Sequence, residues 1–93
     1  MIIFHSFKDR SAADDFARWA TSTAKRSAIV CGTQSESNQI EGFLFPLTPP
    51  IVLVDQPSTG HMTTAAKQKA TKVEKKVIDA AYNFGGSIAS VIQ

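Results

Sequence analysis

The sequence predicts an α+β fold, a two-layer sandwich with two helices on one face of a three- to four-stranded mixed sheet. Two stretches carry apolar residues at helical spacing, one near the start of the chain and one at its end. Short runs rich in β-branched and aromatic residues precede and separate them, and these predict strands. The expected order is β-α-β-β-β-α in one domain spanning residues 1–93, because no linker divides the chain.

The first strand is expected over residues 2–7, which contain four large apolar residues and no breaker. Because side chains alternate along a strand, His5 and Phe7 share one face and Phe4 lies on the other. A helix is expected over residues 12–25.

The sequence indicates where this first helix begins and which of its sides is buried. Ser11 is the expected N-cap, with Asp14 completing a capping box three residues later. Phe16 and Trp19 fall on the apolar side, which predicts that both belong to the core. The alternative for Trp19 is a binding hot spot at an interface, where tryptophan is enriched.

Three further strands are expected in the middle of the chain. The apolar run 28–31 ends before Gly32, and residues 40–45 are rich in strand formers until Pro46 stops them. Residues 51–54 form an unbroken apolar run with no polar side, which is typical of a central strand covered on both faces.

The last helix is expected over residues 64–91. Val77 and Phe84 set the phase of an apolar stripe, and Ile88 and Val91 keep that phase. Gly85-Gly86 lies inside this stretch, where each glycine costs about 1 kcal/mol relative to alanine. The sequence therefore predicts one helix that is weakened at the glycines, not two elements.

The predicted sheet carries more apolar surface than two helices cover. Phe43 and Phe45, in the strand over 40–45, add to Phe4 on this side. Exposed apolar patches mark interaction sites, so Phe43 and Phe45 are predicted to contact a partner or a second copy of the chain.

The positive charge of the chain is concentrated in the last helix. This helix has five lysines and only two acidic residues, Glu74 and Asp79. The lysines are predicted to form one basic side of the helix, made of Lys67, Lys69, Lys72, Lys75 and Lys76. Such a side fits the phosphates of a nucleic acid. Three features speak against it: no arginine lies in this segment, no aromatic residue alternates with the lysines, and Glu74 interrupts them.

Catalytic patterns are weak in this sequence. Asp55 follows the apolar strand and His61 lies six residues later, with Ser58 and Thr59 between them, so a small hydrolase or transferase is one alternative. The second reading of these residues is an ordinary loop before a helix.

A second catalytic pattern would pair His5 with Cys31 as base and nucleophile. Cys31 lies in an apolar run, however, which favours a small core residue. His5, between Phe4 and Phe7, is expected to be a strand residue with a hydrogen-bonded ring nitrogen. The spacing of histidine, cysteine and carboxylate residues predicts no metal site, and the glycines match no phosphate-binding loop, so no cofactor is expected.

The function expected from these observations is that of a small non-enzymatic protein that binds a protein partner. An inhibitor, adaptor or accessory subunit, of the kind that viruses and phages encode, fits this size. Binding of nucleic acid through the lysine side is the alternative. The sequence has no apolar stretch long enough for a membrane span and no secretion signal, and its single cysteine forms no internal disulfide. A cytoplasmic location is therefore expected.

Overall fold

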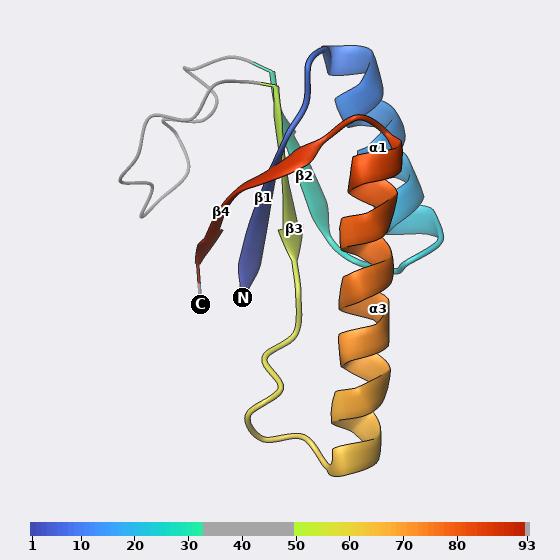
Figure 1. Ribbon diagram of the computed structural model, residues 1–93, viewed down its shortest axis with the longest axis vertical. Helices are drawn as coiled ribbons and strands as arrows, with labels where there is room; N and C mark the ends of the chain where they lie inside the picture. The colour runs from blue at the N-terminus through green and yellow to red at the C-terminus, as the bar shows by residue number, and fades with distance from the viewer. Residues whose placement is uncertain (33–49, 93) are drawn as a thin grey trace.

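The computed structural model describes residues 1–32 and 50–92. Within these residues, four strands and two helices follow one another in the order β-α-β-β-α-β (Figure 1): β1 Ile2–Ser6, α1 Arg10–Ser22, β2 Ala28–Cys31, β3 Ile51–Asp55, α3 Thr64–Asn83 and β4 Ser87–Ile92. The α+β class is confirmed. The strand predicted over 40–45 lies outside the described residues.

The sheet is antiparallel throughout, so the prediction of a mixed sheet was wrong. The strand order is β2-β3-β1-β4, and every neighbouring pair is antiparallel. β1 and β2 run in the same direction, but β3 lies between them, and the first crossover therefore joins strands that do not pair. This is the split β-α-β arrangement of ferredoxin-like folds.

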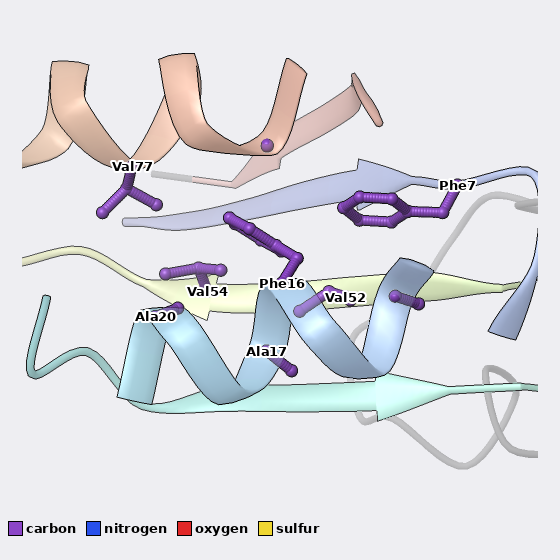
Figure 2. Packing of buried hydrophobic residues seen from close by; sticks show 9 residues of the cluster. Phe7, Phe16, Ala17, Ala20, Val52, Val54 and Val77 are labelled. Carbon is purple, nitrogen blue, oxygen red and sulfur yellow. The ribbon is translucent and has the colours of Figure 1, made fainter. Parts of the chain in front are cut away.

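Both helices cover the same face of the sheet (Figure 1). Phe16 of α1 and Val77 of α3 converge on Val52 and Val54 of β3, with Phe7 at the end of the cluster (Figure 2). All five side chains are buried. Val52 and Val54 share one face of β3 because they lie two residues apart, which is why one cluster gathers residues from both helices.

The opposite face of the sheet holds a second buried cluster, made of Phe4, Cys31, Ile51 and Leu53. With both faces of β3 buried, its position as an inner strand is confirmed. Phe4 belongs to this cluster and is buried, whereas Phe43 and Phe45 lie outside the described residues.

The first helix begins earlier than predicted. Its N-cap is Asp9, whose Oδ1 accepts a hydrogen bond from the Ala12 amide at 2.8 Å, so the capping box at Ser11 was wrong. Aspartate and serine cap helices equally well, and the aspartate comes first along the chain. The helix ends at Ser22 rather than at residue 25, and Lys25 has a φ of 57° where the chain leaves it.

The prediction of one helix over 64–91 was wrong in its last part. α3 begins at Thr64, as expected, but it ends at Asn83. Gly85 has a φ of 90° and donates its amide to the Tyr82 carbonyl, while Gly86 donates to that of Ala81. These two bonds form a Schellman motif, in which glycine adopts the left-handed conformation at low cost.

Gly86 has a second, steric reason to be a glycine. A Cβ atom at this position would lie 2.5 Å from the Phe7 ring. The chain therefore turns tightly beside Phe7 and returns to the sheet as β4. This strand pairs with β1 and is the last in the strand order.

Candidate binding groove

A cavity of about 550 Å³ opens between α1 and α3. Its apolar part comes from both helices, and its polar part comes from α3 alone. The lining residues are Trp19, Lys72, Lys75, Lys76, Asp79, Ala80, Asn83 and Phe84. Because three cations lie next to two aromatic rings, this cavity is the strongest candidate for a binding site among the described residues.

The aromatic part of the cavity is fixed by ring packing. Trp19 is partly buried, and its ring stacks on Phe16 with a centroid distance of 6.3 Å and an interplanar angle of 20°. The ring of Phe84 lies 6.1 Å from that of Phe16. Because Phe16 is fully buried, both cavity rings rest on a fixed support. Trp19 was predicted to belong to the core; it packs against the core but also lines the cavity.

The three lysines lie within about one turn of α3 and are exposed. Lys72 and Lys76 are four residues apart, and Lys75 flanks them on the same side. Asp79 is the one acidic side chain that lines this cavity, and Asn83 adds an amide group. The local charge is positive, with three cations against one carboxylate.

A second cavity, of about 270 Å³, lies nearer the N-terminal end of α3 and shares no lining residue with the first. Lys69 of α3 and Arg26, from the segment after α1, are its charged residues, and its other lining residues are Pro57, Met62, Ala66, Ala70 and Val73. We call the two cavities together the α3 groove. Arg26 is anchored there, because its Nε donates to Oε1 of the buried Gln56 at 3.0 Å.

The predicted lysine side is therefore divided by the fold. Lys69, Lys72, Lys75 and Lys76 line the α3 groove, whereas Lys67 lines neither of its cavities. Glu74, which was expected to interrupt the lysines, instead lines a third cavity with Met1 and residues 57–60.

No protein-family model, curated protein or solved structure matches this chain. Its function is therefore inferred from the chemistry of its own residues.

The first catalytic alternative, at Asp55 and His61, stays a prediction. Asp55 ends β3 and His61 lies in the loop before α3, and both side chains are exposed. No hydrogen bond or ion pair joins them within the described ranges. Neither residue lines the α3 groove or the third cavity.

The second catalytic alternative is excluded by the sheet. His5 faces the helices, with its ring 5.1 Å from that of Phe16, whereas Cys31 belongs to the cluster on the opposite face. Their strands are also separated by β3. Both residues are buried, as expected for Cys31. The expected hydrogen bond to a His5 ring nitrogen was wrong, because neither nitrogen has a partner among the described residues.

Apolar side chains are exposed along the edge strand β4. Ile88, Val91 and Ile92 are 38%, 42% and 37% exposed. β4 contains no charged residue and no proline, the residues with which proteins commonly protect a sheet edge. A register shift opposite Phe4 and His5 is its one irregularity. Sequence reasoning missed this edge because it assigned these residues to a helix.

Two further features are absent from the parts of the chain that the structure describes. No group of three or more histidine, cysteine, aspartate or glutamate residues is arranged to hold a metal ion. Neither α1 nor α3 combines the length and the apolar character of a membrane-spanning helix.

Proposed function

We propose that this protein is a small non-enzymatic binding protein whose α3 groove holds a macromolecular partner with clustered negative charge. The observation that carries this proposal is the convergence of Lys72, Lys75 and Lys76 beside Trp19 and Phe84. Cations around an aromatic surface provide charge attraction together with apolar contact. Tryptophan is also among the residues that contribute most to binding at interfaces.

The form of the groove favours a chain-like partner over a small ligand. The two cavities follow one another along α3, from Ala66 to Phe84, and the cations are spread over both of them. At 1.5 Å per residue, this stretch of helix is about 27 Å long. A single small anion would use only one part of it.

Neutralising Lys72 and Lys76 is expected to weaken binding to polyanions in a salt-dependent way. With both residues changed to Gln, the log–log slope of affinity against salt should flatten by about 1.4 on single-stranded DNA, if each lysine neutralises one phosphate. Glutamine preserves helix propensity, so α3 should stay intact. Fluorescence anisotropy of a labelled oligonucleotide at several salt concentrations measures the slope.

The matched control is a protein in which Lys8 and Lys67 are changed to Gln. This variant has the same net charge as the groove variant, and its two lysines are exposed and line none of the three cavities. Its salt slope should stay close to that of the unchanged protein. Equal losses in both variants would mean that binding follows net charge and that the groove is not the site.

A second candidate function is self-association through β4. The edge is uncharged and apolar, and the sheet is antiparallel, so two copies of β4 related by a two-fold axis can pair without opposing like charges. The result would be a continuous eight-stranded sheet. This proposal takes up the predicted self-association, at a different place from Phe43 and Phe45.

Val91→Lys is expected to abolish this self-association. The unchanged protein should sediment as a dimer and the variant as a monomer, because Val91→Lys puts a charge on the apolar edge through which the two copies would pair. Analytical ultracentrifugation over a concentration series gives both masses. Thr71→Lys, on the exposed side of α3, is the control and should leave the mass unchanged. A monomeric unchanged protein across the series would exclude the β4 interface.

A further inference from the structure

We infer that the occupant of the α3 groove is a single strand of nucleic acid, with a base stacked at Trp19 and its phosphates on the lysines. This inference rests on the proposed function, and it names the class of partner. It also selects the nucleic-acid alternative over the protein partner that the sequence favoured. The fold changes each of the three sequence features that argued against nucleic-acid binding.

The missing aromatic residue is supplied by the other helix. Trp19 of α1 lines the same cavity as Lys72, Lys75 and Lys76 of α3. Its ring is supported from one side by Phe16, so a base that stacks on it meets a surface that is already positioned. Proteins that bind single strands combine a basic groove with aromatic residues in this way.

The missing arginine is supplied by the segment after α1. Arg26 lies in the second cavity with Lys69. Its Nε is held by Gln56, which fixes the guanidinium while leaving its other donors for a phosphate. The interrupting Glu74 lines a different cavity. The groove therefore presents four lysines and one arginine against Asp79.

The spacing of the lysines fits a polymer that carries one negative charge on each repeating unit. Lys69 and Lys76 are about 10 Å apart along the helix axis, with Lys72 between them. Asp79 repels phosphates at its own turn, but its carboxylate is an acceptor for the amino groups of bases, and Asn83 can both donate and accept. Polar groups suited to a base therefore lie near the aromatic ring.

The aromatic ring separates single strands from the other polyanions. In a duplex the bases are stacked on one another, so Trp19 would contact only the backbone. An acidic peptide lacks the flat π-face of a base at each unit.

The fluorescence of Trp19 gives a direct test, since it is the only tryptophan in the chain. The unchanged protein is titrated with a thymidine oligonucleotide, with a DNA duplex of the same length and with poly-glutamate, all at low salt. We expect the single strand to quench the fluorescence and to bind most tightly. Saturable binding of the single strand without any change in fluorescence would overturn the stacking at Trp19.

Two variants of Trp19 then separate stacking from charge. Trp19→Leu should lower affinity for the single strand about tenfold and leave weak duplex binding unchanged, whereas Trp19→Phe should retain most of the affinity. Anisotropy of labelled DNA is the readout, because these variants lack the tryptophan. Circular dichroism identifies any variant that fails to fold, and the titration of the unchanged protein decides the question in that case.

The remaining outcomes distinguish this inference from the function on which it rests. If Trp19→Leu binds the single strand as well as the unchanged protein while the Lys72 and Lys76 variant loses binding, the groove holds polyanions by charge alone and the inference fails. Tightest binding to poly-glutamate would also overturn it, in favour of an acidic protein segment. If none of the three probes shows salt-sensitive binding, the proposed function itself fails.

Discussion

Replacing Phe16 with alanine is expected to lower the free energy of unfolding by about 3–5 kcal/mol. Phe16 is fully buried, and four other rings surround it: His5 at 5.1 Å, Phe7 at 5.3 Å, Phe84 at 6.1 Å and Trp19 at 6.3 Å between centroids. The loss combines the burial of a large apolar side chain with the cavity that its removal leaves. Urea denaturation followed by circular dichroism measures it.

The control for this prediction is Tyr82→Ala. Tyr82 is 55% exposed near the end of α3, so its replacement should change the free energy of unfolding by no more than about 0.5 kcal/mol. A typical domain is stable by about 5–15 kcal/mol, and the loss of Phe16 should therefore leave a protein that is marginally folded. A loss below 1 kcal/mol in Phe16→Ala would show that the two helices do not pack on the sheet through this residue.

The elements from the start of the chain to β3 were predictable because each one satisfies a local rule. β1, β2 and β3 lie where apolar runs end at charged or turn residues, and α1 buries the side that its apolar spacing marks. The largest error there concerns the ends of α1, where Asp9 caps the helix before Ser11. Which strands pair was not predictable, because pairing of β1 with β3 joins segments distant in sequence.

The end of the chain misled the sequence analysis for a geometric reason. Ile88 and Val91 are three residues apart, a spacing that is typical of one side of a helix. In β4, the register shift puts Ile88 opposite His5 and Val91 opposite Ile3, two residues that share a face of β1. An irregular strand thus produces the same spacing as a helix. Gly85-Gly86 was the signal that should have decided between them.

The groove was only half visible in the sequence. The lysines of α3 were found because they repeat within one helix, but Trp19 and Arg26 join them only through the packing of α1 against α3. Spacing along the chain carries no information about such a meeting of two elements. Phe43 and Phe45 stay a prediction, since they lie outside the described residues.

Acid is expected to destabilise the protein through the buried His5. His5 is fully buried against Phe16, neither ring nitrogen has a hydrogen-bond partner in the described part of the chain, and burial lowers its pKa from 6.5 to about 4. Between these two values the unfolded chain binds a proton that the folded protein does not. Stability is therefore complete above pH 6.5 and falls as the pH drops toward 4, by about 3 kcal/mol at 1.36 kcal/mol per pKa unit.

Two single variants assign this loss to one ring. His5→Leu should be at least as stable as the unchanged protein at pH 7, because it removes buried polar nitrogens that lack partners, and its stability should be nearly flat between pH 7 and pH 4.5. His61 is exposed in the loop before α3, so His61→Gln should retain the full acid-induced loss. Urea denaturation at half-unit steps of pH gives the three curves. An equal slope in His5→Leu and in the unchanged protein would show that the folded protein accommodates the charged ring, which is incompatible with a His5 held in the apolar layer between α1 and the sheet.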